Sequence, residues 1–252
     1  MREQIPWKAL NKSSRPNKSP ITLEAAIMAV MPKKTTLSIL QRAAAKNGRI
    51  IATNLEVTAI SDPGYYVYPD GMYLPFPGSK MEPQPDYSLT DFPNIEGLNW
   101  AHYYLEFPES VNWRKLAGCL SHDLMRTALL GVHCRVSGGS FLLEATDGHI
   151  LSRQTGRVDA PDCDFIIPSE LVKIILRAEG YGPVKLLVGE QQASDSPDVM
   201  LAVKHVVGWQ FIAKPIEATY PTTERVLPKE FRHSITVSRS CLLGALAALR
   251  PY

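Results

Sequence analysis

The stretch Phe141-Leu-Leu-Glu-Ala-Thr-Asp-Gly-His-Ile-Leu-Ser-Arg-Gln154 decides the fold of this chain. An apolar run ends at Ala145, is interrupted by Thr-Asp-Gly and resumes at Ile150, which predicts two strands joined by a tight turn. Gly148 can adopt a positive φ in such a turn, and Asp147 can accept hydrogen bonds from the backbone that follows it. The segment therefore predicts an antiparallel hairpin with a polar tip.

The segments around this hairpin predict the same order of elements twice between residues 103 and 214: a strand, a helix and three strands. The first unit comprises strand Tyr104–Phe107, a helix capped by Ser110 that runs to about His122, and strands Leu129–Val136, Phe141–Ala145 and Ile150–Val158. The second comprises strand Asp164–Ile167, helix Glu170–Ala178 opened by Pro168-Ser169, and strands Val184–Val188, Val199–Val203 and Val207–Ile212.

The flanking regions predict less regular structure. Residues 8–20 are basic and rich in Ser, Asn and Pro, which is typical of a mobile arm. Residues 61–99 are crowded with Pro, Gly and Tyr and predict loops with one or two short strands. The remaining predicted elements are helix Leu23–Met31 stopped by Pro32, a hairpin of Leu37–Ala45 and Arg49–Ile60 that turns at Lys46-Asn47-Gly48, strand Ile235–Val237 and helix Ser240–Arg250.

Short sequence matches recur along the chain. Ala52-Thr-Asn-Leu-Glu-Val57 resembles the segment 145–150 at an offset of 93 residues, and Asp91-Phe-Pro-Asn94 resembles Thr219-Tyr-Pro-Thr222 at an offset of 128. Residues 235–243 resemble residues 105–113 at an offset of 130. The first copy is thus 35 residues shorter than the second, about one helix and two strands. Repeated units of one pattern indicate modules related by rotation.

Composition limits the class of protein. The 252 residues allow one large or two modest domains, and 45% hydrophobic with 21% charged residues indicates a globular chain. The net charge of +2 neither requires nor excludes nucleic acid. The four cysteines form no Cys-x-x-Cys pair, and there is no signal peptide or apolar run of membrane-spanning length. We therefore expect a soluble protein of a reducing compartment, the cytoplasm.

The residues suggest one candidate catalytic site and one candidate metal site. Asp147, His149 and Ser152 could suggest a hydrolytic triad, but neighbours on a strand point to opposite faces, and no Gly-x-Ser-x-Gly elbow supports a nucleophile. The sequence also lacks the glycine-rich motifs that hold nucleotides. A polar-tipped turn is the simpler interpretation, and we expect neither catalysis nor a cofactor.

A zinc site is the second possibility. Cys119 and His122 can share a helix face, with His133 and Cys134 nearby in the sequence. His133 and Cys134 are adjacent on a predicted strand and should diverge, so only three ligands converge easily. We therefore predict no metal ion.

Three segments, Glu144–Arg153, Phe165–Leu176 and Tyr220–Pro228, resemble the middle domain of the bacterial DNA polymerase III beta subunits, the beta sliding clamps. The resemblance covers roughly residues 22–60 and 91–250. It implies an α+β DNA-clamp fold of repeated βαβββ units, with antiparallel sheets outside and helices lining the DNA side. The domains it implies are a flexible arm (1–21), a shortened first clamp domain (22–100), a complete central domain (101–230) and the first strand and helix of an incomplete third domain (231–252).

The resemblance implies a processivity factor without a catalytic centre, which encircles double-stranded DNA and tethers a replicative polymerase. Such a ring attracts the phosphate backbone and does not read base sequence. The cations at matching positions are Lys34, Arg114, Lys115, Arg126, Lys173 and Arg177. Lys and Arg are also common on any solvated helix face, so these residues alone do not identify DNA as a partner.

The resemblance also implies a groove for short linear peptides of polymerases and clamp loaders. The matching positions are Leu129, Thr146, Gly148, His149, Leu151, Pro221, Arg225 and Val226. The alternative is that the leucines and valines belong to an ordinary core. Ile150 departs from the family, which usually has an arginine at this position, so an acidic part of a partner peptide would lose its counter-charge.

Three functions follow as alternatives. The first is a homo-oligomeric ring, a dimer or a trimer, that slides on DNA. The second is a clamp-like module or decoy that binds clamp partners without closing a ring. The third, an enzyme with a coincidental motif, is disfavoured by the internal repeat.

Overall fold

The computed structural model describes residues 23–64, 66, 68–75, 81–93, 98–178, 184–191, 198–205, 208–228, 230 and 233–248. The arm predicted over residues 1–21 lies outside the described residues. The chain divides into two units, Met1–Tyr220 and Pro221–Tyr252, and each is described by itself.

The first unit begins with a short module. Helix α1 ends at Val30, before Pro32, as predicted. A turn at Asn47 and Gly48, both with positive φ, joins the first two strands, so the predicted turn is confirmed. The predicted strand Arg49–Ile60 is wrong, because the chain turns at residues 54–56 and forms two strands that pair with each other. The elements of this module are α1 (Leu23–Val30), the 3-10 turn η2 (Ser38–Gln41), strands β1 (Ala43–Lys46), β2 (Arg49–Thr53), β3 (Val57–Ser61), β4 (Gly71–Pro75) and β5 (Met81–Pro83), and the turn η3 (Leu89–Asp91).

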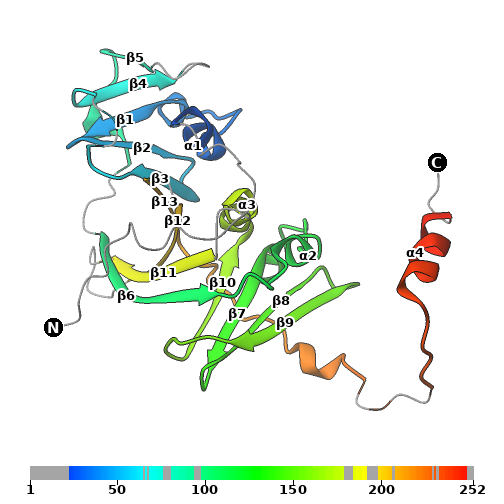
Figure 1. The fold of residues 1–252 in the computed structure, drawn as a ribbon. Helices are drawn as coiled ribbons and strands as arrows, with labels where there is room; N and C mark the ends of the chain where they lie inside the picture. The colour runs from blue at the N-terminus through cyan, green and yellow to red at the C-terminus, as the bar shows by residue number, and fades with distance from the viewer. Residues whose placement is uncertain are drawn as a thin grey trace. The chain divides into compact units, whose positions relative to one another are not determined.

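The rest of the first unit contains the β-α-βββ order twice, as predicted (Figure 1). The first copy is β6 (Leu98–Phe107), α2 (Trp113–Ala117), the turn η4 (Thr127–Leu130), β7 (Gly131–Ser137), β8 (Ser140–Thr146) and β9 (Leu151–Arg157). The second copy is β10 (Cys163–Pro168), α3 (Ser169–Ala178), β11 (Val184–Gln191), β12 (Asp198–His205) and β13 (Trp209–Ala213).

These strands form two antiparallel sheets. The nine-stranded sheet has the order β5-β4-β1-β2-β3-β13-β12-β11-β6, and the four-stranded sheet has the order β10-β7-β8-β9. Strand β3 pairs with β13 in register from Val57↔Ala213 to Ser61↔Trp209, so one hydrogen-bonded sheet runs from the short module into the complete one. The predicted α+β class is thus confirmed.

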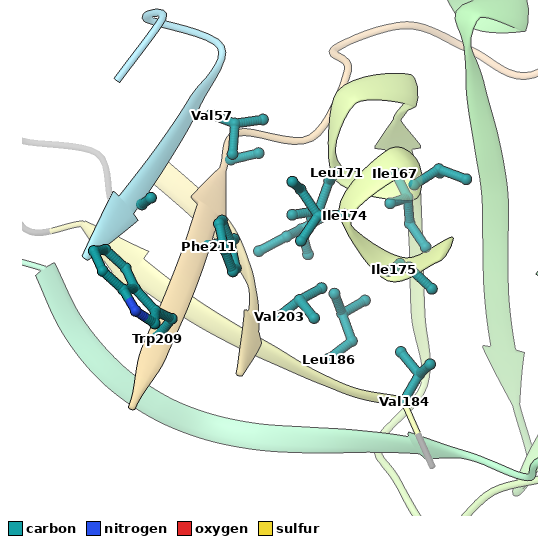
Figure 2. Close-up of a cluster of buried hydrophobic side chains, with 14 of the residues drawn as sticks. Val57, Ile167, Leu171, Ile174, Ile175, Val184, Leu186, Val203, Trp209 and Phe211 are labelled. Atoms are coloured by element: carbon teal, nitrogen blue, oxygen red, sulfur yellow. The ribbon is translucent and has the colours of Figure 1, made fainter. Parts of the chain in front are cut away.

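Helix α3 explains how the repeated units pack. Its buried residues Leu171, Ile174 and Ile175 recur at helical spacing and point toward β11, β12 and β13 (Figure 2). Figure 2 shows the α3 side chains facing Val203 and Phe211 of the sheet. Burying each aliphatic side chain of this kind contributes about 1.5–3 kcal/mol. The polar face of α3 is left for solvent.

Helix α2 is shorter than predicted. It begins after Asn112, whose Oδ1 accepts a hydrogen bond from the Lys115 N–H at 3.0 Å, and it ends at Gly118. Ser110 is therefore not the cap, because the Asn side chain two residues later closes the first turn. The buried face of α2 carries Trp113, which packs edge-on against Phe107 at 5.4 Å.

Two other predicted elements differ from the structure. The segment Ile235–Val237 forms no strand, since no other strand lies in the described part of the second unit and a strand needs a paired neighbour. Residues 38–41, predicted as strand, form the turn η2 instead, and the strand begins only at Ala43. The second unit comprises the turn η5 (Thr223–Arg225) and helix α4 (Arg239–Ala248). In the described parts of both units, no helix is long and apolar enough to cross a membrane.

Candidate functional site

The turn between β8 and β9 has the predicted geometry. Gly148 has φ +96°, a conformation that L side chains rarely adopt. The carboxylate of Asp147 accepts hydrogen bonds from the N–H groups of His149 and Ile150, each at 2.8 Å. These backbone bonds, first that of Ile150, lower the pKa of Asp147 below its usual value. Thr146 closes the turn, because its hydroxyl donates to the Ile150 carbonyl at 2.6 Å.

This geometry bears on the triad considered above. The Asp147 carboxylate accepts hydrogen bonds from backbone N–H groups, so it stabilises the turn and does not orient an imidazole.

Among the described residues no cluster of three or more His, Cys, Asp or Glu side chains is arranged to hold a metal ion. His133 and Cys134, two of the four zinc candidates, occupy successive positions of β7 and so project to opposite faces of the sheet.

The loop that carries Arg126 lies against this turn. A Cβ atom built on Gly148 would come within 2.9 Å of Arg126 Nη1, so the guanidinium fills the space beside the glycine. The Arg126 Nε also lies 3.4 Å from a carboxylate oxygen of Asp123 in the same loop. Arg126, predicted to face DNA, and Gly148, predicted to line a peptide groove, are therefore neighbours.

An ionic cluster around the buried side chains of His133 and Glu144 lies in the four-stranded sheet. His133 Nδ1 is 3.0 Å from Glu144 Oε1, and His133 Nε2 is 2.8 Å from Asp164 Oδ1. Arg153 Nε lies 3.1 Å from the other Glu144 carboxylate oxygen. The ring of Tyr220 stacks on the imidazole with centroids 4.5 Å apart. We call these five residues the His133 cluster.

The environment of His133 favours the charged form of its imidazole. Burial opposes the charged imidazolium, but the hydrogen bonds to Glu144 and Asp164 outweigh burial and raise the pKa of His133. Burial, followed by the charge of Glu144, also raises the pKa of Tyr220, so its hydroxyl stays protonated. The cluster is thus a polar anchor for the chain at Tyr220, the last residue of the first unit.

The His133 cluster was missed by sequence reasoning, because its side chains come from four strands, β7 to β10, and from Tyr220 after β13. Glu144 and Arg153 were inside the quoted motif, yet nothing local marks a buried glutamate as a partner of a histidine eleven residues earlier. Sequence reasoning also missed Leu124 and Met125, which are 77% and 91% exposed in the Arg126 loop.

The predicted DNA-facing cations on helices share one property. Arg114 and Lys115 on α2 and Lys173 and Arg177 on α3 are all exposed, opposite the buried faces of their helices. The two helices contact each other. Lys173 forms an ion pair with Glu170 one turn earlier, which offsets part of its charge. Lys34, also exposed, lies in the loop between α1 and η2.

The structure brings together part of the predicted peptide groove. Thr146, Gly148, His149 and Leu151 belong to one hairpin, and Thr146 pairs with Leu151 across it. Leu129 lies in η4, directly after the Arg126 loop, but it is only 8% exposed and belongs mainly to the core. The other three predicted groove residues, Pro221, Arg225 and Val226, are exposed residues of the second unit.

Comparisons with known proteins give one curated relative and several solved structures, while no family profile matches the chain. The beta sliding clamp of Synechocystis sp. is 25% identical over 166 residues, which cover 61% of this chain and 41% of the relative. This chain thus spans less than half of the curated relative.

The similar solved structures are clamps. The sliding clamp of Bacillus subtilis aligns with a TM-score of 0.63 at 15% identity, and a putative DNA polymerase III beta subunit of Eubacterium rectale with 0.64 at 11%. Both alignments cover 82% of this chain and 65% of the solved chain. A sliding clamp of Pseudomonas aeruginosa bound to griselimycin aligns with a TM-score of 0.58 at 18% identity.

Proposed function

Because this chain has the sliding-clamp fold and is a divergent member of the beta sliding clamp family, we propose that it is a processivity factor that encircles duplex DNA and tethers a replicative polymerase. The observation that carries the proposal is the pair of contacting helices, one from each β-α-βββ unit, with exposed cations on both. Cations on rigid helices attract phosphates without reading bases. In this function the chain has no catalytic centre, binds no cofactor and acts in the cytoplasm.

The sheet that joins the two modules supports assembly into a ring. By the internal repeat, β3 corresponds to β9, since the segments 52–57 and 145–150 match. The edge of β3 is covered by β13, whereas in the described residues β9 pairs only with β8. An open edge of this kind is a template for another strand. We propose that β9 pairs with a strand of a neighbouring module, so that copies join into a dimeric or trimeric ring.

Mass and DNA retention test the ring directly. The full chain is measured by light scattering and is then incubated with nicked circular DNA and with the same DNA after linearisation, with a clamp loader and ATP in both samples. A ring predicts an oligomer that stays on the circle during gel filtration and is lost from the linear form. A monomer that binds polymerase peptides but neither DNA would instead favour the clamp-like decoy.

We propose a second site for linear peptides of polymerases and clamp loaders at the β8–β9 hairpin. Leu151 supplies part of an apolar wall, and Gly148, with the Arg126 guanidinium beside it, supplies a polar edge. Leu129, Thr146 and His149 complete the part of the proposed groove that lies in the first unit. Leu151→Asp should weaken binding of a fluorescent peptide from the C-terminus of a replicative polymerase at least about tenfold, because a charge cannot enter an apolar pocket without losing solvation.

The matched control is Thr155→Asp, an exposed position of the same strand. It should leave the anisotropy titration unchanged. Equal loss in both variants would place the peptide site elsewhere.

A further inference from the structure

A cavity of about 510 Å³ opens beside β10, away from the hairpin described above. Its lining includes Tyr103 from β6, Cys163 from β10, Gly189 from β11 and Lys214 after β13. The ladder between β6 and β11 is irregular between Val188 and Glu190, and Gly189 lies at that irregularity. A bulge of this kind locally separates strands. All lining residues belong to the first unit.

A cysteine in this cavity is surrounded by hydrogen-bond donors. Cys163 pairs with Val136 across β10 and β7, and Cys134 lies two positions further along β7 on the same face. The thiol of Cys134, the hydroxyl of Tyr103 and the N–H of Val136 all donate to the Cys163 sulfur. Cys134 is fully buried, whereas Cys163 is partly exposed and lines the cavity.

These donors favour the thiolate of Cys163. The hydrogen bond from Cys134 is the main cause that lowers the pKa of the Cys163 thiol to about 7, and Tyr103 adds to it, while burial and Asp164 oppose it. The same hydrogen bond, with burial, raises the pKa of Cys134, which therefore remains the protonated partner. Burial also raises the pKa of Tyr103, so its hydroxyl remains a donor.

We propose that Cys163 is a site of reversible thiol oxidation, at which small hydroperoxides enter the cavity and react with its sulfur, and that Cys134 resolves the product as a disulfide. The inference rests on the cavity, the two adjacent sulfurs and the three donors, and it is independent of the clamp function. The oxidant reaches the Cys163 sulfur from the cavity, whereas the Cys134 sulfur is buried.

The proposed oxidation of Cys163 and its resolution by Cys134 take place in two steps. The Cys163 thiolate attacks one oxygen of the hydroperoxide, the O–O bond breaks, and the leaving alkoxide or hydroxide takes up a proton as alcohol or water. Cys163 is then a sulfenic acid. The Cys134 sulfur attacks the Cys163 sulfur, the S–O bond breaks, and water leaves with the thiol proton. Two thiols lose two electrons in total, and the hydroperoxide accepts them.

The other two cysteines lack this environment. Burial, followed by the charge of Asp147, raises the pKa of Cys119, which makes it less nucleophilic at neutral pH. Cys241 lies exposed on α4 in the second unit. Cys119 and Cys241 are therefore internal references in one experiment.

The first test measures alkylation of the full-length protein by iodoacetamide from pH 5.5 to 9.5, with each cysteine followed by peptide mass spectrometry. We expect half-maximal labelling of Cys163 near pH 7, against about 8.5 for an ordinary thiol. Half-maximal labelling above about pH 8 would overturn the proposal. Tyr103→Phe should move the midpoint up by about one unit, because a donor to the charged sulfur is lost.

The second test adds stoichiometric hydrogen peroxide at pH 7, followed by non-reducing digestion. The expected product is a Cys134–Cys163 linked peptide that dithiothreitol separates. In Cys134→Ala a dimedone adduct should instead accumulate on Cys163, and Cys119→Ser should behave as the parent protein. Peroxide that leaves Cys163 reduced, or that links Cys163 to a different cysteine, contradicts the proposal. The wild-type measurements remain decisive if Cys134→Ala does not fold.

Discussion

His133 is the residue whose environment has the clearest consequence for stability. Both of its ring nitrogens face carboxylates, and its ring stacks on Tyr220. Its pKa is raised in the folded chain, so the stabilisation is fully present below the unfolded pKa of about 6.5 and is lost as pH rises through the folded value. The charged groups that face it are Glu144, Asp164 and, through Glu144, Arg153.

We therefore expect His133→Gln to be less stable than the parent protein at pH 5.5 by about 1–3 kcal/mol, and the difference should shrink toward pH 9. Urea unfolding at several pH values measures it. His122→Gln, at an exposed position, is the control and should show no such trend. A difference for His133→Gln that is constant across pH would show that folding does not shift the pKa of His133, and a difference that grows with pH would show that the imidazole is neutral in the folded chain.

Gly156 on β9 has no room for a side chain. It lies directly opposite Phe141, and a Cβ atom at Gly156 would come within 2.6 Å of the Phe141 ring. That ring in turn packs edge-on against Phe107 at 5.4 Å. Gly156→Ala should therefore destabilise the chain by about 1–3 kcal/mol through a displaced aromatic ring. Thermal unfolding measures the loss.

The neighbouring Thr155→Ala should change stability by less than about 0.5 kcal/mol, since Thr155 is exposed. If Gly156→Ala were as stable as Thr155→Ala, the Phe141 ring would have room to move, and the core beneath β8 would be looser than its buried aromatics indicate.

At the scale of elements, helices α2 and α3 carry the proposed contact with DNA. Arg114→Ala/Lys115→Ala should weaken binding to all duplex sequences about equally and reduce the slope of log K against log salt by about 1–2, because each lost phosphate contact releases about one counterion fewer on binding. Titration of labelled duplex at several salt concentrations measures the slope.

The charge-matched control is Arg49→Ala/Lys204→Ala, at exposed positions of β2 and β12. Its salt slope should equal that of the parent protein. Equal slopes for both double variants would assign the DNA contact to another face.

Most helices and strands could be predicted from the sequence, but the side-chain contacts between distant segments could not. The β8–β9 hairpin follows from local chemistry, since Thr146, Asp147 and Gly148 suffice to specify the turn. The start of α2 does not, because the Asn112 N–H donates to Gln154 Oε1 at 2.7 Å, across 42 residues. The His133 cluster and the Cys134–Cys163 contact are likewise made by side chains from separate strands. Patterns in one segment cannot report such pairs.

At the scale of the whole molecule, the open edge of β9 gives the proposed ring a measurable signature. If copies pair there, amides of Leu151–Arg157 that face away from β8 should exchange with solvent more slowly at protein concentrations where oligomers form. Hydrogen exchange over a dilution series measures this. Strand β2, enclosed by β1 and β3, is the internal control and should not change. Protection of β9 that is independent of concentration would exclude this edge as the interface.

The pairing of β3 with β13 also constrains how the chain is made. The two strands lie about 150 positions apart, and synthesis at about 5–20 residues per second separates them by roughly 7–30 s. During that interval the freshly synthesised β1–β3 sheet has an uncovered edge of unpaired backbone N–H and C=O groups, Val57 to Ser61, outside the ribosome. The nascent chain should therefore be a client of ribosome-bound chaperones until Trp209 to Ala213 emerge, and slowing translation should raise the fraction that aggregates.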